Sequence, residues 1–149
     1  MWLQGWARPG TALSLVRYPT TEAITLEFPR RRYPCDECPF RRDNADNPAS
    51  QFPAERWAAL KVTVRDGDNP GLYDPMFGCH KGEPGTGEDL ACAGWLATFG
   101  FDHVRVRLAV ATGALSAAEL SPGENWPALH DSWDEVAAAS SVEQQDTLG

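Results

Sequence analysis

The spacing of four cysteines is the feature that most constrains what this chain can fold into. They follow the pattern Cys35-x2-Cys38-x40-Cys79-x12-Cys92. A Cys-x2-Cys pair in a loop turns both thiolates to one side, so one metal ion takes two ligands from a single turn. A second pair from elsewhere in the chain then completes a tetrahedron and closes a long loop. The pattern predicts a metal site formed by Cys35, Cys38, Cys79 and Cys92.

A fifth candidate ligand, His80, directly follows Cys79. Side chains of adjacent residues seldom both reach one ion. We therefore expect four cysteines as ligands, with His80 next to the ligands and not bound to the metal. A site of three cysteines and His80 is the alternative. Zinc prefers a closed set of four nitrogen and sulfur ligands, and Zn²⁺ is the expected metal. The alternative is an iron–sulfur cluster, which takes the same four thiolates, and Pro39 after Cys38 is typical of ferredoxin loops.

Other interpretations of these cysteines remain open from the sequence. They are two disulfides, a thiol redox pair at Cys35 and Cys38, or a merely buried Cys92. A hydrolytic zinc site is a further alternative, with water as the fourth ligand and His80 or Glu88 as the base. No catalytic serine, zinc-protease or dinucleotide motif occurs, so a non-enzymatic protein is the stronger expectation.

A cluster of arginines flanks the first cysteine pair. Its members are Arg30, Arg31, Arg32, Arg41 and Arg42. One hypothesis is a surface that binds a protein or nucleic-acid partner. The others are that the arginines offset the negative charge of a thiolate site, or that they form an ordinary solvated face. Residues 66–149 carry a net charge of −11 and the whole chain −8, which opposes binding to a nucleic-acid backbone.

Length and composition predict one globular domain. The chain has 149 residues, of which 42% are hydrophobic and 23% charged. No apolar stretch approaches the roughly 18 residues of a membrane span, so no membrane partner is expected. The first residues lack a basic segment followed by an apolar one, so we expect a cytoplasmic location. The oligomeric state is not set by these features.

Short elements are expected, because 12 prolines and 13 glycines punctuate the chain. Alternating apolar residues predict a β-hairpin over residues 11–29. A helix is predicted from Pro53, since Trp57, Leu60 and Val64 form one apolar stripe. The fold class is thus α+β, a small and mostly helical single domain with an N-terminal β-hairpin and a central, metal-stapled loop region.

The second half of the chain is predicted to be helical. Helices are expected over residues 88–99 and from Asp102 to Ala111, the second in competition with a strand, with stops at Gly100 and Gly113. Two short helices are expected after the capping-box residues Ser116 and Ser132. The domain is assigned to residues 1–138, and residues 139–149 to a polar, frayed tail.

The cysteine segments resemble a small, uncharacterised family. The strings are Pro34-Cys35-Asp36-Glu37-Cys38-Pro39, Phe77-Gly78-Cys79-His80 and Cys92-Ala93-Gly94-Trp95. The family is a domain of unknown function from high-GC bacteria and their phages, and the resemblance spans about residues 30–115. It implies that the four cysteines and His80 form one site, and it implies no activity. We therefore expect a small metal-binding protein that acts as a protein- or nucleic-acid-interaction or regulatory module.

Overall fold

The computed structural model describes residues 27–64, 74–82 and 89–142. In these ranges the chain forms four short α-helices, which are α1 (Ala54–Leu60), α2 (Ala93–Phe99), α3 (Val104–Ala111) and α4 (Trp133–Ser140). Five 3-10 turns join them, which are η1 (Arg42–Asn44), η2 (Pro48–Ser50), η3 (Lys61–Thr63), η4 (Gly100–Asp102) and η5 (Ala117–Leu120). Two strands complete the fold, β1 (Phe52–Pro53) and β2 (Ser141–Val142). The small and mainly helical architecture agrees with the prediction.

The predicted hairpin is not seen. The two-stranded sheet of the described residues is parallel, with Phe52 opposite Ser141 and Pro53 opposite Val142. Parallel strands need a long connection, and here it comprises most of the domain, so β1 and β2 are no hairpin. Of the range 11–29, residues 11–26 lie outside the part of the chain that the structure describes.

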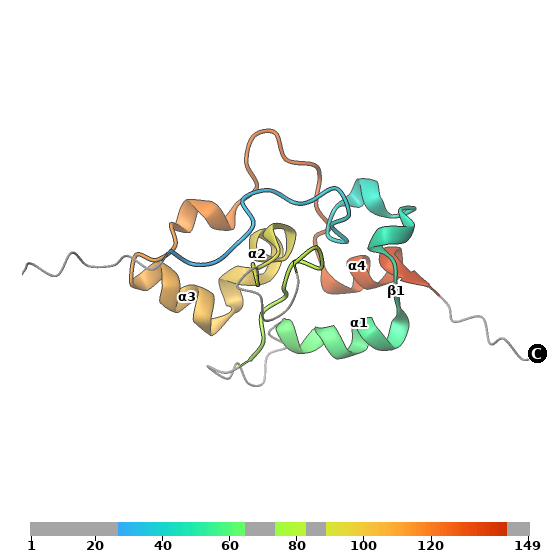
Figure 1. The fold of residues 1–149 in the computed structure, drawn as a ribbon, viewed down its shortest axis with the longest axis horizontal. Helices are drawn as coiled ribbons and strands as arrows, with labels where there is room; N and C mark the ends of the chain where they lie inside the picture. Colours follow the sequence, from blue (N-terminus) through green and yellow to red (C-terminus); the bar gives the residue numbers. More distant parts are fainter. Residues whose placement is uncertain (1–26, 65–73, 83–88, 143–149) are drawn as a thin grey trace, which may run out of the picture.

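The elements form two groups on either side of helix α2 (Figure 1). Helices α1 and α4 lie together with both strands at one end, while α3 and η5 lie at the other end. The segment from residue 27 to residue 40 crosses over α2 from the α3 side to the α4 side (Figure 1). Within the described ranges, no helix is long and apolar enough to cross a membrane.

Aromatic side chains build the core between these groups. The Phe40 and Phe77 rings meet edge to face with centroids 4.9 Å apart, and Trp57 meets Trp133 in the same way at 5.4 Å. Trp57 also donates its indole N–H to the Ser140 carbonyl at 2.8 Å, which ties α1 to the end of α4. Such pairs add to the free energy of burying the rings. Trp57 and Trp133 are therefore core residues.

Helix α4 begins where the sequence predicts, and helix α1 begins at Ala54, one residue after its predicted start at Pro53. Pro53 precedes the first residue of α1, and Trp57 is buried on its inner face. The Ser132 hydroxyl accepts the Glu135 N–H at 3.2 Å and caps α4. Helix α4 and β2 occupy residues 133–142, and the rest of the predicted tail lies outside the described residues.

Helices α2 and α3 start later than predicted. Helix α2 begins at Ala93, because residues 89–92 before it are not helical and Ala91 pairs with Arg30 and Gly78. His103 and not Asp102 caps α3, since the His103 ring accepts the Arg105 N–H at 3.2 Å. The region is helical, as preferred over a strand, and Gly113 follows it with a φ of 78°, a conformation that favours glycine.

His130 gives the domain an expected sensitivity to acid. Its side chain is 8% exposed, its Nδ1 lies 3.7 Å from a carboxylate oxygen of Glu135, and neither ring nitrogen makes a hydrogen bond within the described residues. Burial, and next the charge of Arg42, lower the pKa of His130. The folded protein therefore resists a proton that the unfolded chain takes up at about pH 6.5, so stability falls as the pH drops below that value.

We expect His130→Phe to flatten this dependence. The free energy of unfolding, measured by urea titration between about pH 7.5 and about pH 5, falls more steeply for the natural protein than for the variant. Equal slopes for the two proteins would contradict the assignment.

Candidate metal centre

The first cysteine pair lies in a tight loop held by hydrogen bonds. The Cys38 N–H donates to the Cys35 carbonyl at 3.1 Å, which closes the turn between the two cysteines. Two side chains fasten the same carbonyls from behind. The Arg41 guanidinium donates to Cys35 O at 3.2 Å, and the Asn44 amide donates to Cys38 O at 2.9 Å. The loop therefore presents its thiols in a fixed arrangement, with Cys38 fully buried and Cys35 half-buried.

The second cysteine pair is positioned by three extended segments that lie side by side. Ala91 pairs with Arg30 in parallel and with Gly78 in antiparallel fashion. Around the second pairing, the Cys79 N–H donates to Leu90 O at 2.8 Å and the Cys92 N–H donates to Phe77 O at 2.9 Å. These hydrogen bonds hold Cys79 and Cys92 on adjacent extended segments, although 12 residues separate them in the chain. Both side chains are buried.

The two halves of the site meet at the start of helix α2. The Cys38 and Cys92 sulfur atoms are 3.6 Å apart. Gly94, in the first turn of α2, permits this approach, because a Cβ there would lie 2.8 Å from Cys38 Sγ and 2.8 Å from Phe40 Cβ. Real Cβ atoms do not come so close to other heavy atoms. The absence of a side chain at residue 94 is thus a requirement of the site.

Cys35 links the two pairs. Its thiol donates a hydrogen bond to Cys38, and this bond, together with burial, raises the pKa of Cys35, while Cys79 lies close enough to hydrogen-bond it as well. The pKa of Cys38 is also raised: its hydrogen bond with Cys35 lowers it, but contact with Cys92 and burial outweigh that effect. All four thiols are free. Among the described residues, no three ligand side chains already stand at metal-binding spacing.

His80 lies beside this cluster and faces away from it. Its Nε2 is 3.3 Å from a carboxylate oxygen of Glu37, within the first cysteine loop, and its ring meets the edge of Phe52. The neighbouring Lys81 pairs with Asp36 and lies 3.7 Å from Glu37. His80 and Lys81 therefore clamp the loop of Cys79 onto the loop of Cys35 and Cys38. Of the alternative bases for a hydrolytic site, His80 makes this contact and Glu88 lies outside the described residues.

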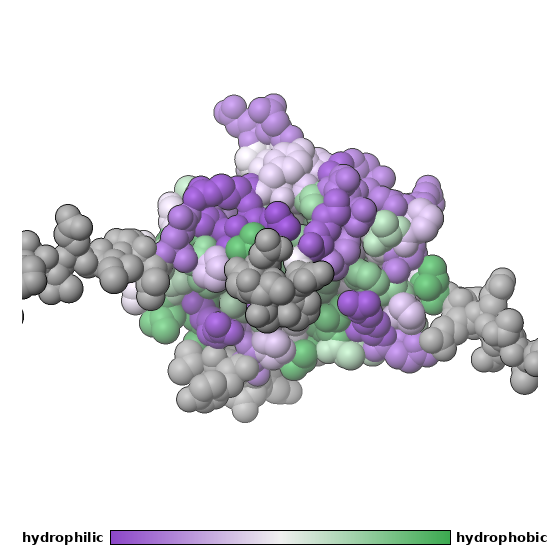
Figure 2. Space-filling model, in the orientation of Figure 1, coloured by the Kyte–Doolittle hydropathy of each residue, from purple (hydrophilic) through white to green (hydrophobic). Residues whose placement is uncertain are grey.

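Most of the arginine cluster is paired within the chain. Arg30 binds Glu119 at 2.8 Å, Arg32 pairs with Glu27, and Arg41 binds Asp43 at 2.7 Å. Arg42 reaches Asp131 at 2.7 Å and Glu135 at 3.1 Å. Arg31 has a buried Nε with no hydrogen-bond partner in the described ranges. Hydrophilic residues do gather over the segment that carries these arginines (Figure 2). Their carboxylate partners, however, offset much of the positive charge of this face.

Three structural roles were not predicted. They are the close approach at Gly94, the carbonyl contact of Asn44, and the clamp between Glu37 and His80. The small residue two positions after Cys92 was a usable signal, because a backbone that must touch a neighbour often carries glycine. No local pattern marks Asn44 or Glu37, because their partners are defined by the folded chain.

The comparisons with known proteins concern the same part of the chain. No curated protein and no solved structure is similar enough to match it. A family of unknown function, DUF6283, matches residues 30–148. The match includes all four cysteines, His80 and the arginine cluster, and it extends beyond residue 115, where the expected resemblance ended, to include α4. The chain is therefore a member of the DUF6283 family.

Proposed function

We propose that the chain is a structural zinc domain, in which Cys35, Cys38, Cys79 and Cys92 bind one Zn²⁺ ion. The observation that carries the proposal is the 3.6 Å distance between Cys38 Sγ and Cys92 Sγ, two residues from separate halves of the site. Zinc–sulfur bonds of about 2.3 Å in a tetrahedron place the sulfur atoms about 3.8 Å apart. The two thiols thus already have the spacing of two ligands on one ion.

The same distance favours zinc over a cubane iron–sulfur cluster. In such a cluster each iron atom takes one cysteine, so the ligand sulfurs are separated by the width of the cluster. The spacing of Cys38 and Cys92 corresponds to two thiolates on one metal atom. Residues Cys35 and Cys79 complete the set through the thiol contacts of Cys35. The alternative function is that of an iron–sulfur redox or sensor protein, in which the same four cysteines bind a cluster that accepts and releases an electron.

Within this proposal the metal joins parts of the domain that share little other structure. The described strands have two residues each, and the helices have seven or eight. A bound ion adds its binding free energy to folding, because the unfolded chain does not hold the ligands together. A closed set of four thiolates leaves no open position for water, so the domain acts by binding and not by hydrolysis.

The arginine cluster has a structural role in the same proposal. Arg41 holds the Cys35 carbonyl while it pairs with Asp43, and Arg42 binds the Leu129 carbonyl at 2.8 Å. Both side chains thereby fasten the cysteine loop to its surroundings. An interaction surface for a protein partner fits this face better than one for nucleic acid, because the neighbouring carboxylates repel phosphates.

Cobalt substitution tests the ligand set. Co²⁺ takes tetrahedral sites that hold zinc, and its sulfur-to-metal absorption grows with the number of thiolate ligands. We expect the spectrum of four thiolates, and we expect His80→Gln to leave it unchanged because His80 faces Glu37. A Cys35→Ser variant is the matched control. We expect it to lower the sulfur-to-cobalt absorption by about the contribution of one thiolate, which is a quarter of the total. A His80→Gln variant that changes the spectrum would show that His80 is a ligand.

A further inference from the structure

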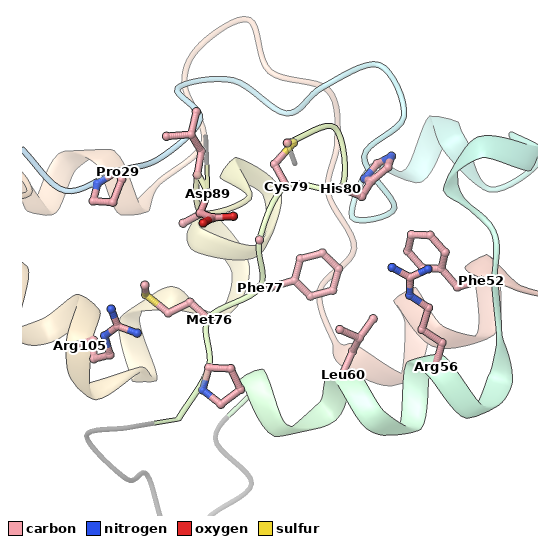
Figure 3. A pocket seen from close by; sticks show the side chains of 15 residues that line it. Pro29, Phe52, Arg56, Leu60, Met76, Phe77, Cys79, His80, Asp89 and Arg105 are labelled. Carbon is pink, nitrogen blue, oxygen red and sulfur yellow. The ribbon is translucent and has the colours of Figure 1, made fainter. Parts of the chain in front are cut away.

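A cavity of about 600 Å³ lies next to the cysteine cluster. It opens to the surface and is lined by helices α1 and α3, strand β1 and residues 75–82 and 89–91, and the wall it shares with the cysteine cluster contains Cys79 and His80 (Figure 3). Cavities of this volume are typical of small-molecule sites. The side chains that matter for its chemistry are Phe52, Arg56, Met76, Phe77, Asp89 and Arg105.

Two guanidinium groups stand on opposite sides of this cavity. In Figure 3, Arg105 of α3 and Arg56 of α1 flank a floor that contains Met76 and Phe77. The carbon of the Arg56 guanidinium lies 4.5 Å from the centre of the Phe52 ring, which holds the cation at the cavity. Within the described residues, neither Arg56 nor Arg105 has a carboxylate partner.

This arrangement is the reverse of the arginine cluster near the first cysteine pair. There the cations are bound by Glu27, Asp43, Glu119 and Asp131. At the cavity no carboxylate of the described residues binds Arg56 or Arg105, although the chain as a whole carries a net charge of −8. Arginines beside an apolar floor are groups that recognise an acidic ligand with an apolar body.

We propose that the cavity binds a small organic anion with a planar, apolar body. Its acidic group receives hydrogen bonds from Arg56 or Arg105, and its ring packs against Phe52, Phe77 and Met76. The proposal goes beyond the zinc site and does not depend on it, because none of the groups that bind the anion is a proposed metal ligand.

Two fluorescent probes that differ by one acidic group test the proposal. They are 8-anilinonaphthalene-1-sulfonate and N-phenyl-1-naphthylamine, which is the same ring system without the sulfonate. The full-length protein is titrated with each. We expect one saturable site per chain for the sulfonate. In the Arg56→Gln/Arg105→Gln variant we expect its affinity to fall about tenfold or more, with little change for the neutral probe.

Arg107→Gln is the matched control. Arg107 is also on α3, but it lies in a different hollow with Phe101, Val110 and Leu120. We expect the affinity for the sulfonate to stay within about twofold in this variant. The proposal is overturned if Arg107→Gln lowers the affinity for the sulfonate and the double variant does not. It is also overturned if the double variant lowers the affinity for both probes equally. Metal content is measured on the same samples, so failure of the zinc proposal is recognised separately.

Discussion

We expect that replacing Cys38 with serine abolishes the proposed metal binding and removes the part of the stability that depends on the metal. Cys38 is fully buried and lies 3.6 Å from Cys92 Sγ, so its sulfur has no substitute from solvent or from a neighbouring residue. A ligand present at about 1,000 times its Kd stabilises the folded state by about 4 kcal/mol. We therefore expect the free energy of unfolding to fall by about 4 kcal/mol or more, as measured by urea titration in the presence of zinc.

A chelator separates the loss of metal from the cost of a buried hydroxyl. Serine at residue 38 has a cost of its own, since burying a poorly bonded polar group destabilises by about 1–3 kcal/mol. The natural protein loses stability when a chelator is added, whereas the Cys38→Ser variant does not respond. The natural protein and the variant responding equally to the chelator would contradict a role for Cys38 as a ligand. The same result is expected for Cys92→Ser.

Adding a single methyl group at Gly94 destabilises the domain. A Cβ at this position would lie 2.8 Å from both Cys38 Sγ and Phe40 Cβ, so helix α2 and the cysteine loop have to separate. Overpacking of a core costs about 1–3 kcal/mol. Alanine is the better helix former by about 1 kcal/mol, which offsets part of this cost. We expect Gly94→Ala to lower the free energy of unfolding by about 1–2 kcal/mol.

The zinc affinity of the same variant falls as well, because the sulfur that meets the added methyl group is a proposed ligand. We expect a loss of about tenfold, by analogy with other changes next to metal ligands, measured by competition with a chromophoric chelator. Gly78→Ala is the control: Gly78 lies beside Cys79, and a Cβ there meets nothing within 4 Å. Its effect should stay within about 0.5 kcal/mol. If the Gly94→Ala variant is as stable as the natural protein, the close approach of helix α2 to Cys38 and Phe40 is not required.

The local parts of the site could be predicted from the sequence. A Cys-x2-Cys turn depends on residues 35–38 and the prolines beside them, so its geometry is encoded within a few residues. The caps of α1 and α4 are local in the same sense, since Pro53 and Ser132 act on the next turn of the chain. The predicted cap of α4 is confirmed because no distant residue takes part in it, whereas the role of the first cysteine pair as metal ligands stays a prediction.

The pairing that brings Cys92 to the site could not be predicted. Residues 88–92 look helical by their apolar periodicity, yet residues 89–92 are extended. Ala91 there bonds to segments around Arg30 and Gly78, and the Arg30 contact spans about sixty residues of chain. Such bonds override a local preference, because each one satisfies a buried backbone group. The consequence for function is direct, since this strand-like segment places Cys92 next to Cys38.

The role of the arginines was equally hidden. Arg42 is 89 residues from Asp131 and 93 from Glu135, so the sequence shows a basic cluster where the folded chain has ion pairs. Conversely, Arg56 and Arg105 are far apart in the sequence and come to the same cavity only in the fold. Charge clusters along a sequence are therefore poor guides to the charge of a folded surface.

Metal content, measured together with an absorption spectrum on protein purified without oxygen, tests the central claim most directly. We expect one zinc ion per chain and no visible absorption band, because a closed tetrathiolate zinc site is colourless. Iron together with sulfide, and a broad band near about 400 nm, would contradict it and identify an iron–sulfur protein that uses the same four cysteines.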